Sequence, residues 1–484
     1  MITPTISVSA TLSPGKKSVG GIERVVTGLI TSWVVLVPWL MGGRFWWTQV
    51  LGAGVGLVAF LLAVSSGENR RALRRFPVFW LGLLFLCYVA CQALNPWALA
   101  VQHRADILVW DLFLLKHVPW LPSGVSGNYF QMSTWRMFVY WLAPWLLVSA
   151  WWAAVRRRRS GRRLVIIIFL NGLLTLAVIL VQRFYPSSIL SWSFIDPYNP
   201  QLPAKPTSAA FYNWDHAGMF LYLSLGAGLA VAGRLMNRAR AEGRDTGLAW
   251  VVLLGCLAIM ASFFITGGRA GLVIACVYFP VGLILLILGA GAKSPGLWAG
   301  ALVLVLGLAA LLVYELHGNN SWTIERWEYL RTHEPEDTRA ILRQETLRMI
   351  QPRLWLGWGA GSYRYVSPDY FREDYYFHNS SVPGGLSLYT DYAHNDWLQI
   401  PMEFGVVGAS FVLGIVLYSV GYALWLGKRL RSEGWVVLLA AAALLVHALV
   451  DFPLYNTAVL ALLCLLVTST IKTASLDARP DTHR

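Results

Sequence analysis

The amino-acid sequence predicts an all-α polytopic membrane protein with about twelve transmembrane helices and both termini in the cytoplasm. Three observations predict this class. Of the 484 residues, 56% are hydrophobic and only 13% are charged, whereas soluble domains carry roughly 25% charged residues. Apolar runs of roughly 17–25 residues, the length that crosses a bilayer as a helix, recur along the chain. The basic residues cluster in alternate connecting segments, as the positive-inside rule requires.

Twelve apolar runs define the expected spans. The first half of the chain contains 25–43, 46–65, 77–94, 136–155, 164–182 and 216–233. The second half contains 247–267, 270–290, 296–314, 405–426, 435–450 and 456–471. The basic residues before the first run resemble the start of a signal peptide, but no small-residue cleavage site follows, so we expect an uncleaved helix. Residues 1–484 are therefore interpreted as a single integral membrane domain.

Orientation follows from the distribution of Lys and Arg. If the N-terminus is cytoplasmic, 24 of the 39 Lys and Arg residues fall in short cytoplasmic segments, and 18 of the 25 acidic residues fall on the other side. The net charge of +14 would also suit a nucleic-acid-binding protein. Because its basic residues alternate with apolar spans, and no nucleic-acid-binding pattern accompanies them, we interpret the charge as a topology signal.

Two segments on the outer side are too long to be simple connections. They are 95–135 and 315–404, and loops of this length are usually functional or disordered. Within the second, an apolar stripe that includes Leu342 and Ile350 predicts a helix over 338–351. The five cysteines all fall inside apolar spans, so we interpret them as packing residues and expect no disulfide and no metal site.

Titratable side chains gather at the outer ends of the expected helices rather than near the bilayer centre. Four separate segments contribute them: Asp215 and His216; Arg269; His394, Asn395, Asp396 and Glu403; His447 and Asp451. The last two lie four residues apart, so they share one face of a helix. The alternation of spans brings all four segments to one side of the membrane, which favours a shared site.

The third of these segments resembles a known family. Ala393-His394-Asn395-Asp396-Trp397-Leu398-Gln399 is similar to the motif that ends the large loop in the O-antigen ligase and polymerase superfamily. Other matches follow the family's order: 211–217 resembles its Asn-x-Asn-His element, 268–271 its Ser-Arg-Gly turn, 356–363 its Gly-x-Gly-x-Gly stretch, and 447–454 its His-x-x-x-Asp element. Asp215 replaces the usual Asn of the first, and Gly268 the usual Ser of the second.

The resemblance implies a C-type glycosyltransferase-like fold and a bacterial inner-membrane enzyme. Such an enzyme moves a glycan from undecaprenyl diphosphate to an acceptor hydroxyl at the periplasmic face, with inversion and without a metal or cofactor. The acceptor would be lipid A core in a ligase, or a second carrier-linked glycan in an O-antigen or exopolysaccharide polymerase, and the residues do not separate the two. A transporter or flippase, the other class considered, predicts midplane ionisable groups and paired broken helices. The sequence shows neither.

The leaving diphosphate requires cationic donors, and Arg supplies a planar fork for phosphate oxygens. The family match implies this role for Arg269, whose alternative interpretation is a snorkelling topology anchor. The family's second Arg has no clear counterpart here. Lys205 and Arg183 are the nearest basic residues, while Arg339 and Arg343 belong either to the diphosphate site or to a solvated face of the loop helix.

His394 is the expected general base, because an imidazole with a pKa near 6.5 accepts a proton from an attacking hydroxyl. The alternative is an ordinary interfacial histidine. Residues expected to support the site are Asn213, Asp215, His216, Asn395, Asp396, Glu403, His447 and Asp451. His447 and Asp451 are expected either to orient the loop or acceptor, or to form a hydrogen-bonded structural pair.

Overall fold

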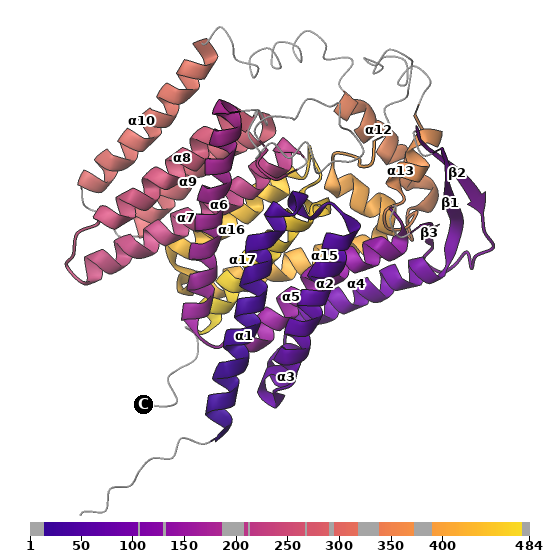
Figure 1. Ribbon diagram of the computed structural model, residues 1–484, viewed down its shortest axis with the longest axis horizontal. Coiled ribbons are helices and arrows are strands. Elements are labelled where there is room, and N and C mark those ends of the chain that lie inside the picture. Colours follow the sequence, from indigo (N-terminus) through magenta and orange to yellow (C-terminus); the bar gives the residue numbers. More distant parts are fainter. Residues whose placement is uncertain are drawn as a thin grey trace, which may run out of the picture.

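The computed structural model describes residues 14–104, 107–128, 132–185, 208–211, 213–266, 269–289, 295–317, 338–371 and 390–476. Near some edges of these ranges only the backbone is described. The described chain forms a bundle of long helices, with a small sheet and several short helices beyond one end of it (Figure 1).

Each of the twelve apolar runs overlaps a helix. In the first half these are α1 (Pro14–Leu36), α2 (Trp46–Val64), α4 (Pro77–Leu94), α5 (Thr134–Ala154), α6 (Arg158–Phe184) and α7 (Trp214–Ala241). In the second half they are α8 (Gly247–Thr266), α9 (Arg269–Gly289), α10 (Pro295–His317), α15 (Asp396–Leu426), α16 (Arg431–His447) and α17 (Thr457–Leu476). The shorter helices are α3 (Gly67–Arg74), α12 (Thr338–Ile350) and α13 (Tyr363–Val366).

By length and composition, these helices divide into those that are long and apolar enough to cross a membrane and those whose described parts are shorter. Within the described ranges, nine helical segments are long and apolar enough to cross a membrane, and one of them, Asp396–His447, contains both α15 and α16. The described parts of α8 and α10 are shorter apolar helices. The class of a helical polytopic membrane protein is therefore confirmed, whereas the number of crossings and the orientation of the termini stay predictions.

Helix α7 lies at the centre of the bundle and packs against α6, α8, α9, α16 and α17. Its small residues permit this close packing. A Cβ atom added at Gly226 would lie 2.6 Å from Ala440 Cβ, and one at Gly228 would lie 2.6 Å from Cys256 Sγ. Small residues at such contacts let membrane helices approach closely enough to gain van der Waals contact.

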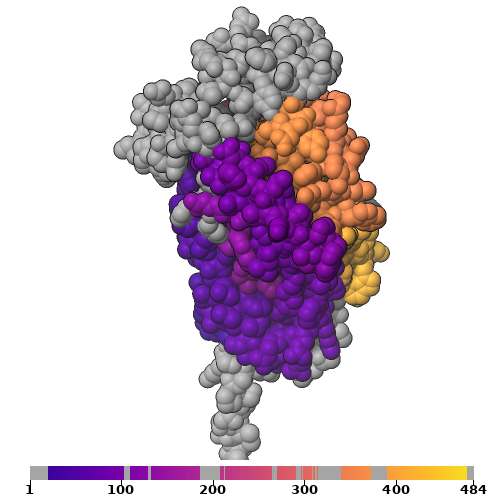
Figure 2. All heavy atoms as spheres, turned by 90° about the vertical axis from the view of Figure 1, so that its right-hand side faces the viewer, coloured from indigo at the N-terminus to yellow at the C-terminus, as the bar shows by residue number. Residues whose placement is uncertain are grey.

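The segment 95–135 folds as a small sheet, which the sequence analysis does not predict. Strand β1 (Pro96–Arg104) pairs antiparallel with β2 (Ile107–Leu114) and parallel with β3 (Gly124–Ser126), in the order β2-β1-β3. Figure 2 shows this part of the chain beside the segment that contains α12 and α13, on one face of the molecule. The described parts of the first and second long loops therefore form one folded cap.

Helix α15 is broken at Gly405, where the backbone adopts φ +62° and ψ −177°. The gap is filled by residues 354–359: the Val406 amide donates to the Leu354 carbonyl (2.8 Å) and the Gly359 amide donates to the Glu403 carbonyl (2.8 Å). The Tyr88 hydroxyl donates to the Phe404 carbonyl at 2.8 Å. The apolar run expected to begin at 405 is thus preceded by a separate helical segment, which carries the polar motif.

Gly405→Ala should destabilise the protein, because the added Cβ would lie 2.3 Å from the Trp355 carbonyl oxygen and the residue's φ is positive. We expect a loss of at least about 1–3 kcal/mol from the backbone conformation alone. This would appear as a lower melting temperature of the purified protein. Gly421→Ala, at a position of the same helix with no other atom within 4 Å, is the control. An equal effect of both variants would show that the break is not under steric constraint.

Candidate functional site

The polar segments expected to share a site meet at one end of the bundle. The first turn of α7, the end of α16, the start of α15 and the connection between α16 and α17 all contribute to it. The basic clusters that begin α6 and end α7 lie at the opposite end. Between His216 and Arg234 of α7, 18 residues of helix span about 27 Å.

His394 and Asp451 form the central contact of this end. The Nδ1 atom of His394 lies 3.2 Å from Oδ1 of Asp451; the His394 side chain is 31% exposed and that of Asp451 is 1% exposed. Burial by itself raises the pKa of the Asp451 carboxyl, but the hydrogen bond with His394 and the surrounding imidazoles outweigh it and hold the pKa below its ordinary value. Asp451 is therefore a carboxylate that can accept from Nδ1–H of His394; when the imidazole is neutral, this tautomer has Nε2 as its acceptor.

The backbone around His394 is held in an uncommon conformation. His394 has φ +50°, in the left-handed region that non-glycine residues seldom adopt and that recurs at functional sites. The chain on either side is fixed: the Ala393 amide donates to Gln399 Oε1 at 2.9 Å, and Asn395 caps α15 by accepting from the Leu398 amide at 3.1 Å. These bonds set the direction of the imidazole.

Phe452 packs between two of the histidines. Its ring lies edge-on to the rings of His216 and His394, each with a centroid distance of 4.7 Å, and stacks on Tyr392 at 4.3 Å. The amide of Phe452 also donates to Asp451 Oδ1 at 3.0 Å. The aromatic ring thus keeps both imidazoles and the carboxylate in fixed relative positions.

His447 and Asp451 do not form the hydrogen-bonded pair that was one interpretation of their spacing. Helix α16 ends at His447, and Asp451 follows a turn. His447 Nδ1 lies 3.1 Å from the Tyr222 hydroxyl, whereas Asp451 bonds His394. The four-residue spacing is retained only in the backbone, where the Asp451 amide donates to the His447 carbonyl at 3.1 Å.

The predicted residues of α7 lie next to this cluster. Asn213 caps the helix, accepting from the Asp215 amide at 3.0 Å, and Asp215 is partly buried. His216 is buried, with Nδ1 at 3.1 Å from Asn456 Nδ2. Within the described residues, Nε2 of His216 has no hydrogen-bond partner.

Asp396 and Glu403 are fully buried and hold loops in place. Asp396 Oδ2 accepts from the Leu454 amide at 2.8 Å. Glu403 accepts from the Gly361 amide and the Tyr455 hydroxyl, both at 2.9 Å, and from Gln399 Nε2 at 2.9 Å. These carboxylates tie the connection 448–456 and the glycine stretch to α15, so we assign them positioning roles.

The glycines of 357–361 allow this stretch to lie very close to the backbones of two other segments. Gly357, Gly359 and Gly361 all have positive φ. A Cβ at Gly357 would lie 2.4 Å from the Glu403 carbonyl oxygen, and one at Gly359 would lie 2.3 Å from the Gly124 Cα. This stretch therefore joins the break of α15 to strand β3.

The predicted diphosphate-binding cations differ in how they lie relative to the histidine cluster. Arg269 is the first residue of α9, and its side chain is outside the described part. The start of this helix lies near His447, because a Cβ added at Gly271 would lie 3.8 Å from His447 Cε1. The charge of Arg339 acts on His447. Arg183 and Arg343 are exposed, and no described contact joins either to the histidine cluster. Lys205 lies outside the described residues.

Three further arginines surround the site and were missed by the sequence analysis. The charges of Arg136, Arg44 and Arg364 all act on Tyr392, whose pKa is raised to about 12 mainly by burial. Arg364 forms an ion pair with Asp391, three residues before His394. Arg44 and Arg136 stand at the outer ends of expected spans, so a survey of every cation at that depth would have found them.

A cleft of about 410 Å³ lies between β2 and the segment around α13. Among its lining residues are Trp110, Asp111, Arg364, Tyr365 and Asp369. The rings of Trp110 and Tyr365 meet edge-to-face at 5.3 Å, and the Arg364 guanidinium lies 5.4 Å from the centroid of Trp110. Aromatic faces beside charged hydrogen-bonding groups can bind sugar rings.

Within the described residues, no group of three or more His, Cys, Asp or Glu side chains is arranged to hold a metal ion.

Comparisons with known proteins find a similarity in one region of the chain. A search of curated proteins finds no match to the chain. The family model described as O-antigen ligase matches residues 250–413, a region that includes Arg269, the glycine stretch and the His394 motif. Residues 250–413 are therefore similar to the O-antigen ligase family, which supports the resemblance of the chain to the O-antigen ligase and polymerase superfamily.

Proposed function

We propose that this protein transfers a glycan from an undecaprenyl-diphosphate donor to an acceptor hydroxyl at the periplasmic face of the bacterial inner membrane. The family match supports an O-antigen ligase-like function at the level of the family. The observation that carries the finer proposal is the contact between His394 and the buried carboxylate of Asp451. It provides a partly exposed imidazole whose tautomer is fixed, as a general base requires.

The proposed step is a single displacement. The acceptor oxygen attacks the anomeric carbon, the bond from that carbon to the diphosphate oxygen breaks, and the diphosphate departs with the electron pair. His394 Nε2 takes the proton of the acceptor hydroxyl, and Asp451 stabilises the imidazolium that forms. Because the attack is opposite the leaving group, the anomeric centre inverts. Asp451 does not itself need to take up the proton.

Cations around this cluster would neutralise the leaving group. A lipid diphosphate gains negative charge as it departs, so guanidinium groups held at its position stabilise the transition state more than the ground state. We propose Arg269 for this role on the family match, with Arg339 as a second contact because its charge acts on His447. Arg44 replaces Arg183 as a candidate for an additional contact, because its charge acts on both His216 and Tyr392.

The cleft beside β2 is proposed to hold sugar units of the donor or the acceptor. Its Arg364 is ion-paired with Asp391, so the cleft is connected to the segment that carries His394. Trp110 and Tyr365 would supply the apolar contact, and Asp111 and Asp369 would accept bonds from sugar hydroxyls. Substrate binding in the cleft would thereby be coupled to the position of the catalytic loop.

The test is transfer by the purified protein from a synthetic undecaprenyl-diphosphate glycan. Two acceptors are offered separately: lipid A core, as a ligase requires, and a second carrier-linked glycan, as a polymerase requires. We expect product with one of them. Asp451→Asn should lower the rate by up to about 10⁴-fold, because an asparagine that donates to Nδ1 favours the wrong tautomer of the histidine.

The control for this variant is Asp245→Asn, an exposed carboxylate at the start of α8 whose capping bond an asparagine can also make. It should transfer at the wild-type rate. If wild-type protein forms no product with either acceptor, the proposed function fails. If Asp451→Asn transfers normally, the function stands but the assigned dyad does not.

A further inference from the structure

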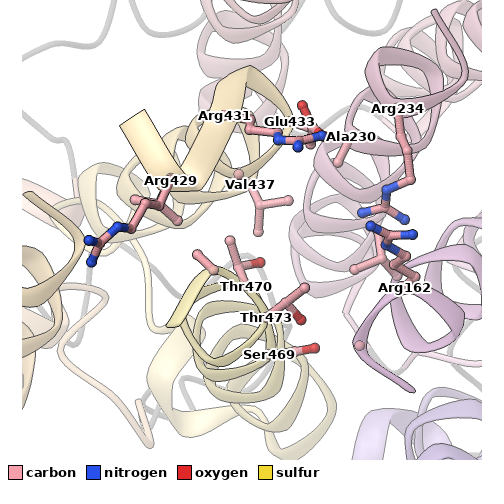
Figure 3. A pocket seen from close by; sticks show the side chains of 15 residues that line it. Arg162, Ala230, Arg234, Arg429, Arg431, Glu433, Val437, Ser469, Thr470 and Thr473 are labelled. Atoms are coloured by element: carbon pink, nitrogen blue, oxygen red, sulfur yellow. The ribbon is translucent and has the colours of Figure 1, made fainter. Parts of the chain in front are cut away.

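A small cavity with several charged lining residues lies at the end of the bundle opposite His394. It has a volume of about 60 Å³ and is lined by residues of α6, α7, α16 and α17. Figure 3 shows its principal polar residues: Arg162, Arg234, Arg431, Glu433, Ser469 and Thr473. None of these belongs to the site described above, and the proposed transfer reaction does not use them.

Two arginines in this cavity face one another. Figure 3 shows the guanidinium groups of Arg162 and Arg234 side by side, and the charge of Arg162 acts unfavourably on Arg234. Within the described residues, neither has a carboxylate within ion-pairing distance. The one acidic residue that lines the cavity is Glu433, which is buried, accepts from Asn237 Nδ2 at 3.2 Å, and lies beside Arg431. The charge of Glu433 acts favourably on Arg234, so this single carboxylate faces the positive charges of Arg162, Arg234 and Arg431.

Helix α17 supplies neutral hydroxyl donors beside the arginines. Ser469 is 1% exposed, and its Oγ has no hydrogen-bond partner in the described part of the chain. A Cβ at Gly161 would lie 2.9 Å from this Oγ and 2.2 Å from Thr473 Oγ1. A buried hydroxyl without a partner costs free energy, so a ligand that accepts a hydrogen bond from Ser469 Oγ would remove this cost.

We propose that this cavity binds a phosphate group, through the guanidinium groups of Arg162 and Arg234 and the hydroxyl of Ser469. Guanidinium forks and hydroxyls are donors suited to phosphate oxygens. The volume holds a few water-sized groups, which suits a single phosphate rather than a sugar. The source is either free phosphate or the headgroup of an anionic phospholipid, since basic pockets between membrane helices bind such headgroups.

Thermal stability of the whole purified protein tests the proposal. Inorganic phosphate is added to protein in detergent, against chloride at equal ionic strength. In a second arm, nanodiscs of phosphatidylcholine are compared with nanodiscs that also contain phosphatidylglycerol. A ligand that binds the folded state raises the melting temperature, and we expect an increase of at least about 2 °C. An increase with phosphate identifies the free ion as sufficient, and an increase with phosphatidylglycerol alone identifies the headgroup.

Variants connect the effect to the cavity. Arg162→Gln combined with Arg234→Gln should remove the ligand-dependent increase, and so should the milder Ser469→Ala, which keeps the helix packing. Arg163→Gln changes an exposed neighbour of Arg162 outside the cavity lining and should keep the increase. The proposal is overturned if neither ligand stabilises the wild type. It is also overturned if Ser469→Ala shows the same ligand-dependent increase as the wild type and Arg163→Gln.

Discussion

His394→Ala should slow glycan transfer at least about a hundredfold while donor binding stays nearly unchanged. A positioned general base typically contributes 10²–10⁴-fold to a rate. The imidazole is partly exposed and its Nδ1 is occupied by Asp451, so the variant loses the proton acceptor and leaves the proposed diphosphate contacts in place. The measurements are the transfer rate of the purified protein and, separately, its affinity for the carrier-linked glycan.

The dependence of the rate on pH adds a second readout. A protonated imidazole cannot accept the acceptor's proton, so the wild-type rate should fall as the pH is lowered and the imidazole takes up a proton. Asp451, whose pKa lies below its ordinary value, stays ionised over that range and does not cause the fall. In His394→Ala the residual rate should lose this dependence.

The matched control is His117→Ala, a partly exposed histidine of the first long loop that contacts only the Leu115 carbonyl among the described interactions. It should transfer at the wild-type rate. A His394→Ala variant that loses donor affinity in proportion to its rate would show that the histidine holds the loop over the donor. Unchanged turnover would exclude the general-base role.

Hydropathy was sufficient to locate the long apolar helices, because a run that lies in lipid must satisfy its backbone hydrogen bonds internally. The same signal missed the start of α15. Its first turns carry Asp396 and Glu403, whose charges lower the hydropathy although both side chains are buried. Their burial depends on partners from distant segments, such as the Leu454 amide and the Tyr455 hydroxyl, which no local pattern reveals.

The sheet of 96–126 was missed for a different reason. Its two longer strands are short apolar runs beside prolines and tryptophans, which could equally be irregular loop. Long-range contacts stabilise the sheet. Trp97 Nε1 of β1 donates to the Trp358 carbonyl at 2.8 Å. The Val125 amide of β3 donates to Thr134 Oγ1 at 3.0 Å, and this hydroxyl donates to the Ala360 carbonyl at 3.1 Å. The second long loop thus supports the first.

The site was predicted as a set of residues but not as a set of contacts. The spacing of His447 and Asp451 suggested a pair on one helix face, yet the helix ends between them and Asp451 turns towards His394, 57 residues away in sequence. Family order indicated that these motifs belong together. Which atom meets which depends on the turn after α16, where three consecutive residues leave the helix.

Arg269→Ala should reduce transfer below detection while expression and membrane insertion remain normal. Removing one donor that stabilises a developing charge typically costs 10²–10³-fold, and a departing diphosphate demands more than one such contact. Arg269 begins α9 two residues before Gly271, whose backbone lies against His447, so the helix start is at the catalytic cluster. The measurement is transfer from the carrier-linked donor, together with donor affinity.

Two further variants separate chemistry from anchoring. Arg269→Lys keeps the charge but loses the planar fork, so it should recover only part of the rate; an arginine that merely fixes topology would be fully replaced by lysine. Arg183→Ala removes an exposed arginine at the end of α6 without a described contact to the histidine cluster, and it should transfer normally. If Arg269→Ala were fully active, the diphosphate would have to be held by other cations, and the charges of Arg44 and Arg339, which act on His216 and His447, make these two arginines the next to be replaced.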